Sequence, residues 1–124
     1  MELKMINSNL ITIEDLENIQ YLDGFNLPQR VFEIFKRTTR NNDFLTYEIA
    51  KKKLIRNIML SYEAPEKVGL EYKRVFYFGN LAIHLNLNEK SISYINNNFD
   101  IERTFEMDLK KKKTLNYIMG IRND

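Results

Sequence analysis

The spacing of apolar residues changes along the chain, from a helical period in the first half to strict alternation in the middle. Between residues 81 and 87 every second residue is leucine or isoleucine. A β-strand directs successive side chains to opposite faces, so this alternation predicts a strand with one buried face. His84, the only histidine, falls on the other face. We therefore expect it to project from the polar side of a sheet.

Three helices are predicted before this strand, over about residues 12–21, 27–40 and 46–62. Thr12 followed by Asp15 approximates a capping box at the start of the first helix. Asn26 is a favourable N-cap for the second helix, and Pro28 is tolerated in its first turn. Pro65 follows the third helix and prevents it from continuing.

Three strands and a last helix complete the prediction, with strands over about residues 71–78, 81–87 and 91–95. Gly79-Asn80 suits a tight turn between the first two strands, and the run 96–98 of asparagines is expected to end the third. Asp100 can cap a final helix that ends near Gly120. The predicted fold is a single α+β domain over residues 1–124, with helices on one face of a three-stranded antiparallel meander and a C-terminal helix.

Composition excludes several classes of chemistry. The chain has no cysteine, so disulfides, thiolate metal sites and cysteine nucleophiles are excluded, and one histidine cannot make a two-histidine metal site. The four glycines form no phosphate-binding loop. We therefore expect no metal and no cofactor. The chain also lacks an apolar run of membrane-spanning length and a signal-peptide pattern at residues 1–10, so a soluble cytoplasmic protein that does not enter a membrane is expected.

Charge is distributed unevenly along the chain. Residues 1–29 contain five acidic residues and one basic residue, whereas residues 30–56 contain eight basic and three acidic residues. A phosphate-binding surface is predicted on the second and third helices, formed by Arg30, Arg37, Lys52, Lys53 and Arg56. The alternative is that these side chains form a solvated helix face. The basic run 110–113 is interpreted as a solubility and helix-dipole feature.

The predicted sheet carries a candidate catalytic group. A metal-independent ribonuclease needs a base for the 2′-hydroxyl, a cation for the developing phosphorane and a proton donor. His84, Arg74 and Tyr77 have the chemistry for these roles, and the alternative is a structural or merely exposed histidine. Aromatic residues of the sheet could also stack unpaired bases, or they could pack in the core: Tyr72, Phe76, Tyr77, Phe78 and Tyr94.

The order of features over residues 27–95 resembles that of small toxin nucleases of the barnase, EndoU, colicin and RelE-like superfamily. The resemblance is carried by the segments LPQRVFEIFKRTTRNN, TYEIAKKKLIRNIMLSYEAP and KRVFYFGNLAIHLNLNEKSISYI. Many relatives have a histidine just before the first arginine of the early helix, where this chain has Pro28 and Gln29. RelE-like members rely on basic and tyrosine side chains, so the resemblance implies roles for Lys52, Arg56, Arg74 and Tyr77.

Three functions are compatible with these observations. The first is an RNA-directed, toxin-like protein, either a metal-independent ribonuclease or a relative that only binds. The second is a non-enzymatic protein of a phage or mobile element that inhibits a host factor. The third is a binder of a phosphorylated or nucleotide small molecule. The expected partner is RNA or a host protein, and a homodimer is compatible with the sequence.

Overall fold

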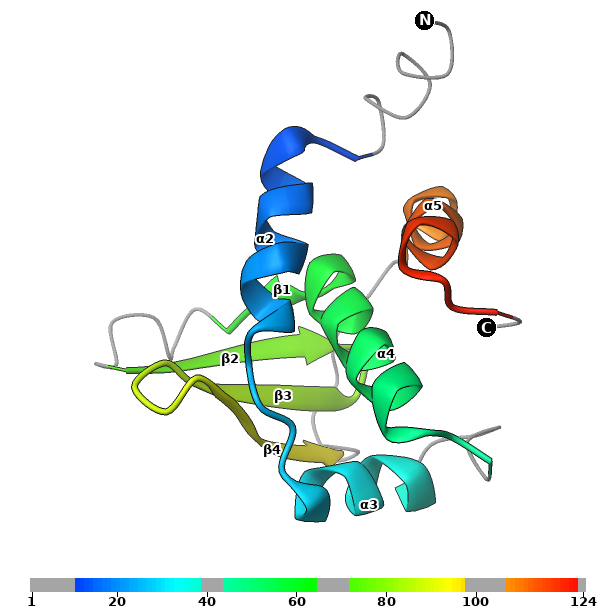
Figure 1. Ribbon diagram of the computed structural model, residues 1–124. Helices are drawn as coiled ribbons and strands as arrows, with labels where there is room; N and C mark the ends of the chain where they lie inside the picture. The colour runs from blue at the N-terminus through cyan, green and yellow to red at the C-terminus, as the bar shows by residue number, and fades with distance from the viewer. Residues whose placement is uncertain (1–10, 39–43, 65–71, 98–106, 123–124) are drawn as a thin grey trace, which may run out of the picture.

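The computed structural model describes residues 11–38, 44–64, 72–97 and 107–122, and these ranges contain four helices and one four-stranded antiparallel sheet (Figure 1). The α+β prediction is confirmed. The helices are α2 (Ile13–Asp23), α3 (Gln29–Thr38), α4 (Tyr47–Leu60) and α5 (Leu109–Met119). The strands are β1 (Tyr62–Glu63), β2 (Lys73–Phe78), β3 (Leu81–Asn86) and β4 (Ser91–Asn97).

The sheet has one more strand than predicted. Its order is β1-β2-β3-β4, with every neighbouring pair antiparallel. The additional strand, β1, has two residues and pairs with the end of β2. Two residues are too few for an alternating pattern, so the sequence offered no signal for this strand. The predicted third helix, expected to reach residue 62, ends at Leu60 and leaves room for it.

The two faces of the sheet bury different clusters. Helices α2, α3 and α4 lie on one face (Figure 1), and the side chains of Ile83 and Leu85 from β3 pack there in the main core. The apolar face predicted for β3 is thereby confirmed, but the opposite face is not a polar, solvent-facing one, because Ala82 is buried there and His84 is half-buried. On the other face, Val75 and Tyr77 form a smaller buried cluster with Ala82 and other neighbours. The core side of β2, which the sequence could not assign, is the side of its phenylalanines.

Helix α4 is the centre of the helical layer. It packs against α2, α3, α5 and β2. All side chains from residue 53 to residue 58 are buried, including the polar ones of Lys53, Arg56 and Asn57. A sequence with apolar residues on one stripe predicts one buried face. The packing of neighbours around α4 buries the polar stripe as well.

The helix caps and the turn that depend only on neighbouring residues form as predicted. The Thr12 hydroxyl accepts from the Asp15 N–H and the Asp15 carboxylate accepts from the Thr12 N–H, which makes the predicted capping box. Gly120 ends α5 in the left-handed conformation, with φ at 73°, and Gly79 takes a positive φ of 59° in the predicted turn.

Two further predicted boundaries were wrong. Asn26 does not cap α3, which begins three residues later at Gln29. Instead the Asn26 N–H donates to the Lys90 carbonyl, and the Asn26 carbonyl accepts from the Ile92 N–H. Strand β4 also continues through Asn97, so the asparagines at 96 and 97 belong to the strand. The predicted Asp100 cap lies outside the described residues, and α5 begins at Leu109 with Asp108 as its N-cap.

Candidate functional site

The three predicted catalytic residues do not come together. In the β2–β3 register, His84 pairs with Val75 and Arg74 pairs with Leu85. Paired residues of an antiparallel sheet share a face, so Arg74 lies on the helix side and His84 lies on the opposite side. Tyr77 is on the same face as His84, where it is buried. The grouping of all three in one site was therefore wrong, because positions 74 and 77 differ by an odd number of residues.

His84 makes contacts that tie it to the sheet surface. Its Nε2 lies 3.1 Å from Oδ1 of Asn96, and its ring centroid lies 5.3 Å from that of Tyr94. Tyr77 is held in an edge-to-face contact with Tyr62, with centroids 5.5 Å apart. These contacts match the structural alternative considered for a sheet histidine.

Arg74 is held by a carboxylate from the unexpected strand. Its Nε and Nη2 donate to the two carboxylate oxygens of Glu63 at 3.0 and 2.7 Å. The guanidinium carbon also lies 5.1 Å from the centroid of the Phe76 ring. The hydrogen bond from Arg74 lowers the pKa of Glu63, and the same bond raises the pKa of Arg74. Arg74 is therefore fixed in position as a charged group.

Arg74 borders a cavity of about 400 Å³ between α2, α4 and the sheet. The floor is apolar and consists of Leu22, Ile58, Met59, Phe76 and Leu85. The polar lining consists of Glu14, Asp15, Asn18, Tyr21 and Arg74. This pocket could not be predicted from the sequence because its lining comes from four elements. The only local signal was the helical spacing of Glu14, Asn18 and Tyr21, which places them on one face of α2.

The five residues of the predicted phosphate-binding surface are divided between different environments. Arg30 and Arg37 are exposed on α3, Lys52 is half-buried, and Lys53 and Arg56 are buried in α4 with exposures of 7% and 4%. Helices α3 and α5 lie toward opposite ends of the molecule (Figure 1). The five side chains therefore do not form one exposed surface, because α4 is enclosed by its neighbours.

Arg56 joins α4 to α5. Its guanidinium donates to Oδ1 of Asn57 at 2.8 and 3.2 Å and to Oδ1 of Asn116 in α5 at 3.0 Å. Side chains of α5 and of the residues that follow it, Leu115, Met119 and Ile121, are buried. A buried guanidinium with amide partners on two helices therefore contributes to the docking of α5 on α4.

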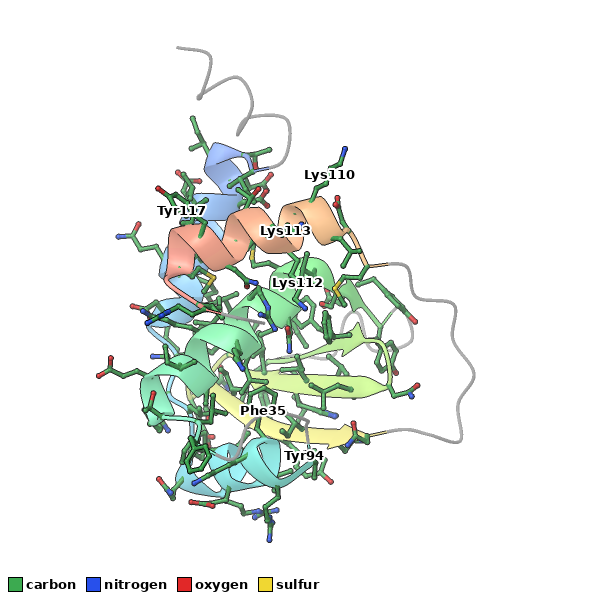
Figure 2. All side chains as sticks on the ribbon, turned by 90° about the vertical axis from the view of Figure 1, so that its right-hand side faces the viewer. Phe35, Tyr94, Lys110, Lys112, Lys113 and Tyr117 are labelled. Atoms are coloured by element: carbon green, nitrogen blue, oxygen red, sulfur yellow. The ribbon has the colours of Figure 1, made fainter. Side chains whose placement is uncertain are left out.

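The docking of α5 places two basic helices next to each other. Helices α4 and α5 together contain eight basic residues and one acidic residue. Lys110 and Lys113 are exposed on α5, and Tyr117 is 88% exposed one turn further along the helix. Figure 2 shows these side chains along α5, on the side turned to the viewer, with Lys112 below them. The Lys52 ammonium group lies beside Gly120, at the C-terminal end of α5, where the helix dipole favours a positive charge.

The described residues contain no group of three or more acidic or histidine side chains arranged to hold a metal ion. Within the same part of the chain, no helix is long and apolar enough to cross a membrane. A family model named YorE matches residues 25–117 of the chain. The chain belongs to the YorE family. No curated protein and no solved structure matches the chain.

The region that matches the YorE family model contains the two basic helices, α4 and α5. It includes α3, α4, the sheet and α5 as far as Tyr117. It begins at Phe25, after α2. Membership of the YorE family therefore bears on the α4–α5 pair, whereas the α2 wall of the pocket is a feature of this chain outside the matched region.

Proposed function

We propose that this YorE-family protein binds single-stranded RNA through α5 and the adjoining part of α4, and that it acts by binding rather than by cleavage. The observation that carries this proposal is the packing of α5 on α4, which brings the basic residues of two distant segments together. The residues of this cationic surface are Lys110, Lys113 and Tyr117, which are exposed on α5, and Lys52 and Lys112, which are half-buried.

The chemistry of this cationic surface suits a nucleic-acid backbone with unpaired bases. Each lysine that neutralises a phosphate releases counterions, which favours binding at low salt. An exposed aromatic ring offers a stacking platform for a base, and the ring of Tyr117 stands beside the lysines of α5.

The separation of the predicted catalytic residues favours binding over cleavage. Arg74 is on the helix side of the sheet and is paired with Glu63, whereas His84 is on the opposite face. A ribonuclease site requires its base, cation and acid within reach of one phosphate. This arrangement supports the binding-only form of an RNA-directed protein.

The proposal can be tested by fluorescence polarisation with a short labelled single-stranded RNA. The double variant Lys110→Gln/Lys113→Gln removes two exposed charges from α5. The matched control Arg30→Gln/Arg37→Gln removes two exposed charges from α3. We expect the α5 variant to bind roughly tenfold more weakly and to reduce the salt slope by about 1.4, because two phosphate contacts of about 0.7 each are lost. The α3 control should bind like the wild type.

Three results would contradict the proposed binding surface. One is that the wild type shows no salt-dependent binding of RNA. Another is that the α3 control loses as much affinity as the α5 variant, which would assign binding to the surface predicted from sequence. The third is that polyglutamate or anionic lipid vesicles bind as tightly as RNA, which would indicate an acidic protein or a membrane surface. Gel analysis of the incubated RNA completes the test, because cleavage would exclude a binding-only role.

A further inference from the structure

The pocket between α2 and β2 is separate from the RNA-binding surface proposed above, and its lining has its own chemistry. We propose that it binds a small zwitterion with an apolar body, such as an apolar α-amino acid. In this assignment Arg74 receives the carboxylate, the polar face of α2 receives the ammonium group, and the apolar floor receives the side chain.

The size and floor of the cavity suit a small organic ligand. Its volume of about 400 Å³ lies in the range of small-molecule pockets, and its lining combines a polar wall on α2 with an apolar floor. The floor combines side chains from α4 and both central strands, including Ile58, Phe76 and Leu85. Such a floor stabilises an apolar body by removing it from water.

Arg74 is held in place with hydrogen-bond donors that remain for an anionic ligand group. The Nε and Nη2 of Arg74 donate to Glu63, and its Nη1 donates to no other described residue. The side chain is 45% exposed, so these remaining donors can be reached from the cavity. The Glu63 carboxylate and the Phe76 ring hold the guanidinium in place, which reduces the entropy lost when a ligand binds.

The wall of the cavity that α2 forms is acidic and polar, in contrast to the cationic Arg74. Glu14 and Asn18 are exposed on it, and neither makes a hydrogen bond or ion pair with another described residue. Asp15 is already engaged, because it accepts from the Thr12 N–H and lies 3.7 Å from the Lys111 ammonium. The Glu14 carboxylate therefore remains as the charge available to a ligand cation.

The charges of the two walls together select a zwitterion. A ligand with only a carboxylate would meet Arg74 but also the acidic residues of α2. A ligand with only an amine would meet Glu14 but also the guanidinium of Arg74. A ligand with both groups places each charge beside one of opposite sign, which complements the cavity better than either single charge.

A ligand series tests this selection directly. Thermal unfolding and calorimetric titration are measured with phenylalanine, phenethylamine and 3-phenylpropionate, which share the same ring and differ in their charged groups. Leucine and methionine are included as alternative apolar bodies. We expect phenylalanine to raise the melting temperature and to bind about tenfold more tightly than its two single-charge analogues. Equal binding of an analogue, or no binding of any amino acid, would overturn the proposal.

Variants locate the site and separate it from the RNA-binding surface. Arg74→Gln and Glu14→Gln are each expected to weaken amino-acid binding about tenfold. The matched controls are Lys73→Gln, the neighbour of Arg74 on β2, and Glu17→Gln on α2, neither of which lines the cavity. An equal loss in the controls would contradict the assignment. RNA affinity should stay unchanged in the lining variants, so failure of either proposal can be recognised independently of the other.

Discussion

Arg56 and Arg74 carry the same charged group, and their surroundings give the two side chains different roles. Arg56 is buried between α4 and α5 and donates to the amides of Asn57 and Asn116. Arg74 is exposed on β2 and pairs with the carboxylate of Glu63. Both were predicted to contact phosphate or substrate. The comparison teaches that the elements that cover an arginine decide whether it joins helices or offers donors to a ligand.

The largest expected effect is on Arg56. Substitution Arg56→Ala opens a cavity and leaves the side-chain oxygens of Asn57 and Asn116 without this donor. We expect a loss of roughly 3 kcal/mol in the free energy of unfolding, measured in urea. Arg56→Met restores much of the volume but not the donors, and should recover part of the loss. Arg37→Ala on the exposed side of α3 is the control, and an equal effect there would remove the distinction between buried and exposed arginines.

A smaller effect is expected for the partner of Arg56 on α5. Asn116→Ala removes one acceptor and should cost about 1 kcal/mol of unfolding free energy. RNA affinity should also fall, because α5 is then held less firmly on α4. Asn116→Asp retains an acceptor and adds an opposite charge, so its stability should equal or exceed that of the wild type. If Asn116→Asp destabilises as much as Asn116→Ala, the bond to Arg56 does not hold α5.

The pair on β2 should contribute less and depend on pH. The folded state lowers the pKa of Glu63 from its ordinary value of 4.5, because Arg74 donates to its carboxylate. The stabilisation is therefore present above that value and is lost as the pH falls through the folded pKa. Arg74→Gln should cost at most about 1 kcal/mol at neutral pH, since the pair is partly exposed. Urea unfolding near neutral pH and in acid checks this, and a pH-independent difference would contradict it.

The smallest effect on stability is expected for the outward lysines of α5. Lys110→Gln/Lys113→Gln should change the free energy of unfolding by no more than about 0.5 kcal/mol, because both side chains are exposed. Urea unfolding of the double variant measures this. A large loss of stability would indicate that these lysines support the fold, and the RNA-binding test would then need single substitutions.

Features that depend on neighbouring residues could be predicted from the sequence. The Thr12 cap, the start of a helix near Thr46, the Gly79 turn and the apolar alternation of β3 follow from interactions within a few positions of the chain. The α+β class followed from the order of these elements. Strand β1 was missed because it exists only through its pairing with β2.

The sites depend on contacts between distant segments, which the sequence pattern does not contain. Nothing in the spacing of α4 shows that α5 covers Arg56, so this residue was placed on an exposed surface. The run 110–113 was interpreted as solvated and as favoured by the helix dipole at a C-terminal end. The dipole interpretation was wrong, because α5 begins at Leu109 and these lysines lie at its N-terminal end. Packing separates the members of the run, since Lys111 approaches Asp15 while Lys110 and Lys113 remain exposed.

The central claim is that α5, docked on α4, forms the RNA-binding surface of this YorE-family protein. Its most direct test is an NMR titration of the ¹⁵N-labelled protein with single-stranded RNA. The account predicts amide shift changes concentrated at Lys110, Lys113 and Tyr117 and at the adjoining end of α4. Shift changes concentrated on α3 around Arg30 and Arg37, or on the sheet around His84, would contradict it.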